Sequence, residues 1–247
     1  MNRPQTNRRK LIIASTSTVH GSPYLSYILP RLQTFFAGTD EIIFIPYARP
    51  GGMTHDAYTE TAAGGLGEIG KKVIGLHTFS DPVRAIRNAR AVFTGGGNTF
   101  LLVKQLYENG IVQPLREAVF GGLPYFGTSA GANITGLTMQ TTNDMPIVYP
   151  PSFDTLGAVS FNINPHYLDP DTRSTHMGET RETRIREFHK INPQAVVGLR
   201  EGSWLHVSGE HITLEGELPA RVFEQGKEAY ELPEGSQLSF LEHEIMG

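Results

Sequence analysis

Residues 123–131 read Leu-Pro-Tyr-Phe-Gly-Thr-Ser-Ala-Gly, a short apolar run followed at once by a serine between two glycines. An apolar run of this length is typical of a strand buried on both faces of a parallel sheet. The pattern Gly-x-Ser-x-Gly directly after such a strand predicts a sharp turn into a helix, with the Ser129 hydroxyl exposed at the carboxyl end of the sheet. The glycines fit, because residues without a Cβ atom let other backbone approach a strained turn closely. The alternative is an ordinary Gly-rich and Ser-rich turn.

The same alternation of strand and helix runs through the chain before this point. Further apolar runs predict strands at residues 11–14, 41–46, 72–76 and 91–93. Segments with helical spacing lie between them, at residues 24–36, 55–70, 82–89, 99–109 and 111–120. Regular alternation of this kind predicts an α/β fold with a doubly wound, mostly parallel sheet.

The last part of the chain has a different pattern. A helix is expected at residues 178–190 and a buried strand at 195–199, followed by short strands at 204–207, 211–214 and 221–223. No Pro-rich or Ser-rich linker and no internal repeat divides the sequence. We therefore expect a single domain over residues 1–247 with a β-rich carboxyl-terminal portion, and a flexible tail at the polar, basic residues 1–9.

The composition excludes several classes of function. The chain has 247 residues and no cysteine, which excludes disulfides, thiolate metal sites, iron–sulfur clusters and a cysteine nucleophile. The net charge is −4 and the cations are scattered, so we expect no nucleic-acid partner. The apolar runs of the chain are too short for a signal peptide or a membrane span, so we expect a cytoplasmic protein with no membrane partner.

A second glycine-rich segment, Gly95-Gly96-Gly97-Asn98, follows the strand predicted at residues 91–93. It matches neither common phosphate-binding motif. Acyl transfer from a serine requires two N–H donors from separate loops, so we expect an oxyanion hole formed by the backbone of Gly97 and Ala130. The alternative is a tight turn in which Asn98 caps the helix that follows, and Asn98 could serve both purposes.

A serine nucleophile also needs a base, and His166 is the candidate among nine histidines. It follows Asn164-Pro165, and because proline restricts the residue before it to extended geometry, His166 is expected at a rigid strand end or loop. The other histidines lie in less informative segments, and no pair has the spacing of His-x-x-x-His or His-Glu-x-x-His. We therefore expect no metal cofactor.

Two carboxylates compete to orient this base. Glu201 ends the strand predicted at residues 195–199, where a triad acid would lie, although a solvated turn residue before Gly202 is an equal alternative. Asp144 lies in a polar loop after the helix that follows Ser129, and its alternative is a turn residue before Pro146. Along the chain, the order of the site residues is Ser, His, Glu if Glu201 is the acid, and Ser, Asp, His if Asp144 is the acid.

Together these segments resemble the peptidase E family, serine peptidases with a class I glutamine amidotransferase-like, flavodoxin-like fold. The resemblance extends over nearly the whole chain, and the matching blocks are residues 95–100, 127–133, 141–148, 163–166, 178–181, 184–187 and 201–202. It implies a cofactor-free hydrolase of dipeptides with an N-terminal aspartate. Ser129 would be the nucleophile, His166 the general base, and Glu201 or Asp144 the third member. We prefer Glu201 as the direct partner of the imidazole, because it ends a predicted core strand.

The resemblance also implies that Arg181 binds the substrate's aspartate, with Asn98 a further substrate-binding residue. A planar guanidinium meets a carboxylate with two parallel hydrogen bonds, which suits this task. The alternative is that Arg181 belongs to a solvated, charge-rich helix face with Arg173, Arg184 and Arg186.

Two other functions are alternatives to the dipeptidase. One is a hydrolase of β-aspartyl dipeptides of the cyanophycinase type, and the other is a non-catalytic binding module on the same sheet. The presence of Ser129, His166 and two candidate acids argues against the binding module. The expected partner is a small peptide substrate, and the chain is expected to be a monomer or a homodimer.

Overall fold

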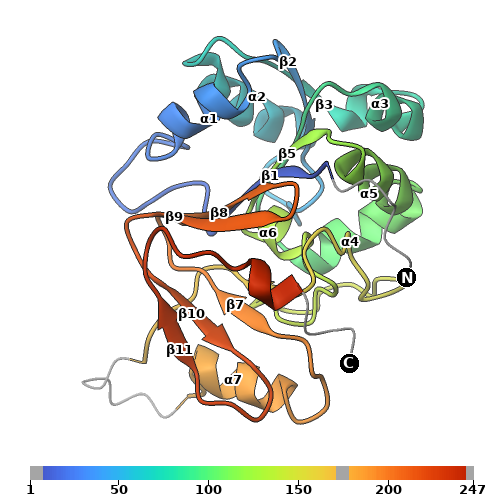
Figure 1. Ribbon diagram of the computed structural model, residues 1–247. Coiled ribbons are helices and arrows are strands. Elements are labelled where there is room, and N and C mark those ends of the chain that lie inside the picture. Colours follow the sequence, from blue (N-terminus) through green and yellow to red (C-terminus); the bar gives the residue numbers. More distant parts are fainter. Residues whose placement is uncertain (1–7, 171–177, 243–247) are drawn as a thin grey trace.

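The computed structural model describes residues 8–170 and 178–242. A seven-stranded sheet forms its centre, in the order β3-β2-β4-β5-β1-β8-β9 (Figure 1). The first five strands in this order are parallel, and the last two extend the sheet in antiparallel fashion. The strands are β1 (Lys10–Ala14), β2 (Glu41–Ile45), β3 (Lys72–Gly75), β4 (Val92–Thr94), β5 (Pro124–Thr128), β8 (Ser203–Ser208) and β9 (His211–Gly216).

Helices cover both faces of this sheet. They are α1 (Leu29–Phe35), α2 (His55–Gly67), α3 (Pro82–Asn88), α4 (Thr99–Glu108) and α5 (Val112–Phe120), with short helices η1 (Leu76–Thr78), α6 (Ala130–Asn133) and η2 (Ser239–Glu242). Alternate residues of β1 show the two layers: Ile12 packs in the apolar cluster of α1 and α2, and Ile13 in that of α3, α4 and α5. The predicted doubly wound α/β fold is therefore confirmed.

A second sheet carries the carboxyl-terminal portion, in the order β11-β10-β7-β6. Its strands are β6 (Asn162–Asn164), β7 (Val196–Gly198), β10 (Ala220–Phe223) and β11 (Tyr230–Leu232). Helix α7 (Arg181–Phe188) lies against it, below the main sheet in Figure 1. Ile185 of this helix belongs to one apolar cluster with Val196 and Phe223. Val197 on the other side of β7 belongs to the apolar cluster of the main sheet, so the two sheets share a core.

Two sequence-based predictions need correction. The helix expected at residues 24–36 begins only at Leu29, because Leu25 has a φ of 59°, which a right-handed helix does not allow. The tail expected at residues 1–9 does not include Arg9, which is fully buried. The Arg9 guanidinium donates to the carbonyl of Gly209 and forms an ion pair of 2.8 Å with Glu242. Residues 1–7 lie outside the described residues.

Over the described ranges, every helix falls short of the length and apolar character needed to cross a membrane.

Candidate active site

Ser129 lies at the turn between β5 and α6, with a φ of 54° and a ψ of −111°. Such angles cost a non-glycine residue about 1–3 kcal/mol and persist only where the surroundings impose them. Here the Ser129 N–H donates to the carbonyl of Ala14, and the Ser129 carbonyl accepts from Asn133. A Cβ atom at Gly131 would lie only 2.2 Å from the carbonyl oxygen of Thr94. The strained turn therefore depends on glycine at this position, as the motif predicts.

His166 follows β6 and approaches Ser129 from the second sheet. Its Nε2 lies 2.8 Å from Ser129 Oγ, and its Nδ1 lies 2.6 Å from Oε1 of Glu201. Glu201 lies in the turn between β7 and β8. The side chains of His166 and Glu201 are 36% and 42% exposed, so the site is open to a small ligand. The nucleophile candidate thus comes from the main sheet, and the base and acid candidates come from the second sheet and the turn that follows it.

Asp144 lies elsewhere in the site, at the amino terminus of α4. Its Oδ2 accepts hydrogen bonds from the Thr99 N–H at 2.7 Å, the Thr99 hydroxyl at 2.6 Å and the Thr142 hydroxyl at 2.9 Å. A carboxylate here is favoured by the unpaired N–H groups and the dipole of the helix. Within the described part of the chain, Oδ1 of Asp144 accepts no hydrogen bond and none joins Asp144 to His166.

The glycine-rich segment after β4 packs directly against Ser129. A Cβ atom at Gly96 would lie 2.8 Å from the Ser129 Cβ, and Gly97 has a φ of 140°, which favours glycine. The N–H groups of Gly97 and Ala130 donate no hydrogen bond to any described residue. These two N–H groups, which have no acceptor among the described residues, are therefore candidate donors for an oxyanion hole.

Asn98 has its amide engaged within the protein. Its Oδ1 accepts from the Leu101 N–H at 3.1 Å and caps α4, and its Nδ2 donates to the carbonyl of Met145 at 2.9 Å. The capping alternative is therefore present, and Asn98 also fixes the loop that contains Asp144.

Arg181 is the first residue of α7, and Thr180 caps this helix by accepting from the Thr183 N–H. The neighbouring Arg184 and Arg186 pair with carboxylates, and Arg173 lies outside the described residues. Arg181 makes no hydrogen bond or ion pair within the described ranges. Partial burial, together with the charge of Arg184, lowers the pKa of Arg181, and Asp144 acts in the opposite direction. A partly desolvated guanidinium that pairs with no described residue is suited to bind an anion.

Ser15 is a further residue beside the candidate site, and no motif in the sequence marks it. It is fully buried directly after β1, accepts from the His166 N–H at 2.9 Å and donates to the carbonyl of Leu199 at 2.8 Å. These contacts hold His166 at a φ of 53°, which is unusual for a non-glycine residue. The available signal was its position, since polar residues at the carboxyl ends of parallel strands often line a site.

Comparison with known proteins gives three findings. The model of the family described as Peptidase family S51 matches residues 11–215. The chain is 50% identical over 231 residues to "Peptidase E" of Streptomyces coelicolor, covering 94% of each chain. It is 45% identical to "Probable alpha-aspartyl dipeptidase" of Drosophila melanogaster, covering 94% of this chain and 97% of the relative.

The fold also matches a solved structure. The crystal structure of a peptidase from an acI-B1 Actinobacterium superposes with a TM-score of 0.71 and covers 95% of this chain and 99% of the other. The two sequences are only 14% identical, so this likeness concerns the fold alone.

Proposed function

The chain belongs to peptidase family S51, and from this membership we propose that it is a serine dipeptidase that hydrolyses dipeptides with an N-terminal aspartate. The proposal rests on two consecutive hydrogen bonds. One joins Ser129 Oγ to His166 Nε2 at 2.8 Å, and the other joins His166 Nδ1 to Glu201 at 2.6 Å. A serine, an imidazole and a carboxylate in this arrangement have the geometry of a nucleophile, its base and the acid that orients the base.

Each group has a defined task in this mechanism. Ser129 Oγ attacks the carbonyl carbon of the aspartyl residue while His166 Nε2 accepts the hydroxyl proton. Glu201 stabilises the resulting imidazolium through Nδ1. The carbonyl oxygen gains negative charge and accepts hydrogen bonds from the N–H groups of Gly97 and Ala130.

The second half of the reaction uses the same groups. His166 donates its proton to the leaving amine, the C–N bond breaks, and an aspartyl ester of Ser129 is left. Water then attacks this ester, with His166 as the base, and free aspartate leaves.

Recognition of an N-terminal aspartate fits the charges of Asp144 and Arg181. The N-terminal aspartate of a dipeptide presents an ammonium group and a side-chain carboxylate close together. We assign the carboxylate to the guanidinium of Arg181 and the ammonium to Oδ1 of Asp144, because no described residue forms a hydrogen bond with either group. Asn98 contributes by fixing the Asp144 loop through Met145. The proposed partner is therefore a dipeptide, and a cytoplasmic location stays a prediction from the sequence.

Hydrolysis of α-Asp-Leu by the purified protein, followed by chromatography of the released amino acids, tests this function. We expect cleavage of α-Asp-Leu and little or none of Asn-Leu, which has the same shape without the charge. Cleavage of β-Asp-Arg but not of α-Asp-Leu would replace the proposal with the β-aspartyl hydrolase. Failure of an active-site serine reagent to label Ser129, with no cleavage of either peptide, would favour the binding module.

A further inference from the structure

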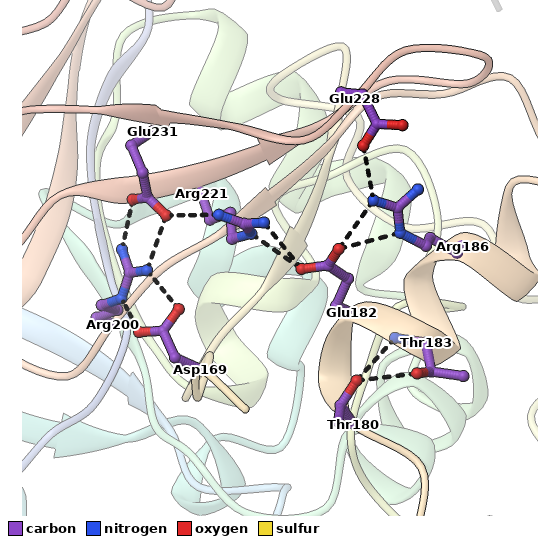
Figure 2. Close-up of polar contacts among 9 residues, drawn as sticks. All are labelled: Asp169, Thr180, Glu182, Thr183, Arg186, Arg200, Arg221, Glu228 and Glu231. Atoms are coloured by element: carbon purple, nitrogen blue, oxygen red, sulfur yellow. Dashed lines mark hydrogen bonds and ion pairs between the residues drawn. The ribbon is translucent and has the colours of Figure 1, made fainter. Parts of the chain in front are cut away.

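Arg200 joins two carboxylates from distant parts of the chain (Figure 2). Its guanidinium meets Asp169 through contacts of 2.9 and 2.7 Å, and Glu231 through contacts of 2.8 and 3.0 Å. The Arg200 side chain is only 13% exposed, and its guanidinium lies 5.4 Å from the centroid of the Tyr167 ring. This arginine is thus held from several sides.

Arg221 continues the line of ion pairs from Glu231 to helix α7 (Figure 2). It contacts Glu231 at 3.0 Å, and its Nε and Nη2 contact Glu182 at 3.1 and 3.0 Å. We call the five residues Asp169, Arg200, Glu231, Arg221 and Glu182 the ion-pair network. Arg186 is not a member of the network: it pairs with Glu182 on the same helix and with the exposed Glu228, and so joins no further segment of the site.

Three members of the network adjoin residues of the candidate site. Arg200 directly precedes Glu201, Asp169 follows His166 by three positions, and Glu182 directly follows Arg181. The network therefore connects the segments that contain the proposed acid, base and substrate-binding arginine, although none of its members takes part in the line from Ser129 to Glu201.

We propose that the ion-pair network positions the active site through two separable arms. In the first arm, the Arg200–Asp169 pair holds the segment after His166 against the turn that contains Glu201. In the second arm, Arg221 holds Glu182, and thereby places Arg181 for the substrate carboxylate. The inference rests on the proposed function, because it assigns the second arm to the binding of an N-terminal aspartate.

The electrostatics of the network support a positioning role. Isolated ion pairs at the surface contribute little to stability. Bidentate contacts of a mostly buried arginine, in contrast, fix the relative positions of the paired side chains. Hydrogen bonds from Arg200 lower the pKa of both Asp169 and Glu231, and the two carboxylates raise the pKa of Arg200. The pairs therefore stay charged at neutral pH. Helix α7 also packs through Ile185, so the loss of one ion pair is expected to leave the fold intact.

Kinetics of three variants test the two arms on α-Asp-Leu. Arg221→Met is expected to raise KM about tenfold with little change in kcat, because it displaces a group that binds substrate. Asp169→Asn is expected to lower kcat about tenfold with little change in KM, because it loosens the base against its acid. Arg186→Met is the matched control: it removes a charge from the same cluster without separating the site segments, and both constants should be unchanged.

A second readout separates the inference from the proposed function. The rate of labelling of Ser129 by an uncharged fluorophosphonate depends on the activated serine and not on Arg181. Asp169→Asn should slow this labelling about tenfold, and Arg221→Met should leave it unchanged. If wild-type protein is labelled but cleaves no Asp dipeptide, the proposed substrate is wrong, and the labelling rate of Asp169→Asn still tests the first arm.

Other outcomes would overturn the inference. Wild-type constants in both variants would show that the network positions nothing, and an equal loss of kcat in both would show a general structural role. Should Arg221→Met fail to fold, Arg221→Lys provides the same test, because lysine keeps the charge but lacks the fork that contacts Glu231 and Glu182 together.

Discussion

Glu201 Oε1 lies 2.6 Å from Nδ1 of His166, on the side of the ring opposite Ser129. Asp144, the competing acid in the sequence, instead accepts three hydrogen bonds from Thr99 and Thr142 at the start of α4. The two carboxylates therefore face different parts of the site. This separation predicts different kinetic effects when each carboxylate is removed.

Glu201→Gln is expected to lower kcat on α-Asp-Leu by a factor of about 10²–10⁴, because the imidazolium loses its counter-charge and its correct tautomer. KM should change little, since Glu201 touches no substrate in the proposed mechanism. Steady-state kinetics measure both constants. Asp144→Asn is the comparison, and it should mainly raise KM by weakening the bond to the substrate ammonium. The opposite pattern, with kcat lost only in Asp144→Asn, would return the orienting role to Asp144.

Ser129→Ala is expected to abolish turnover of Asp dipeptides, since hydroxyl attack is the only covalent step assigned to the protein. The variant should keep the circular-dichroism spectrum and thermal midpoint of the wild type, because alanine removes only the Oγ atom. Incubation with a chelator is expected to leave the wild-type rate unchanged. Residual turnover equal to that of the wild type would remove Ser129 from the mechanism.

Arg181→Met is expected to remove the preference for α-Asp-Leu over Asn-Leu, because the charged group that distinguishes the two is lost. The preference is measured as the ratio of kcat/KM for the two peptides, and labelling of Ser129 by an uncharged reagent should stay at the wild-type rate. Lys190→Met, which removes an exposed charge just beyond the same helix, is the control and should keep the preference. A variant that still discriminates would show that another group binds the aspartate.

The fold was predictable because its signals are local. Residues 11–14 and 42–45 are continuously apolar, and all of them are buried in β1 and β2. The Gly-x-Ser-x-Gly segment likewise encodes its own turn. Strands β6 (Asn-Ile-Asn) and β11 (Tyr-Glu-Leu) were missed, since neither is an apolar run and their pairing depends on distant strands.

The arrangement of the site was only partly predictable. The sequence identified Ser129 and His166 as candidates, because a motif and a proline mark their positions. It left Glu201 and Asp144 as alternatives, since both follow structured segments and only tertiary contacts distinguish them. Contacts such as that of Asp169 with Arg200, 31 positions apart, have no local signature at all.

Stability at low pH is expected to depend on Glu215. Burial alone would raise the pKa of this carboxyl, but hydrogen bonds from His206, Arg31 and Trp204 outweigh it and lower the pKa to about 2. Because folding lowers the pKa of Glu215, its ionised form stabilises the folded protein. This stabilisation is complete above the pKa of the unfolded chain, near 4.5, and is lost as the pH falls toward 2.

The Glu215→Gln variant tests this dependence. It should be about 1–2 kcal/mol less stable than the wild type at pH 7, after allowance for the 28% exposure of the side chain. The difference should shrink below pH 4 in urea denaturation. A difference that stays constant between pH 7 and pH 3 would show that packing, and not charge, is the contribution of Glu215.

Gly131 is expected to be irreplaceable for the structure of the turn, independently of any chemistry. An added Cβ would lie 2.2 Å from the carbonyl oxygen of Thr94, which is backbone of β4 and cannot rotate away. Gly131→Ala should therefore lower the free energy of unfolding by about 2–3 kcal/mol, measured by urea denaturation. Gly64→Ala is the matched control: it lies exposed in α2 with nothing near its Cβ position, so it should gain about 0.5–1 kcal/mol. If the two substitutions had the same effect, the close approach of β4 to the turn would not be what requires glycine at position 131.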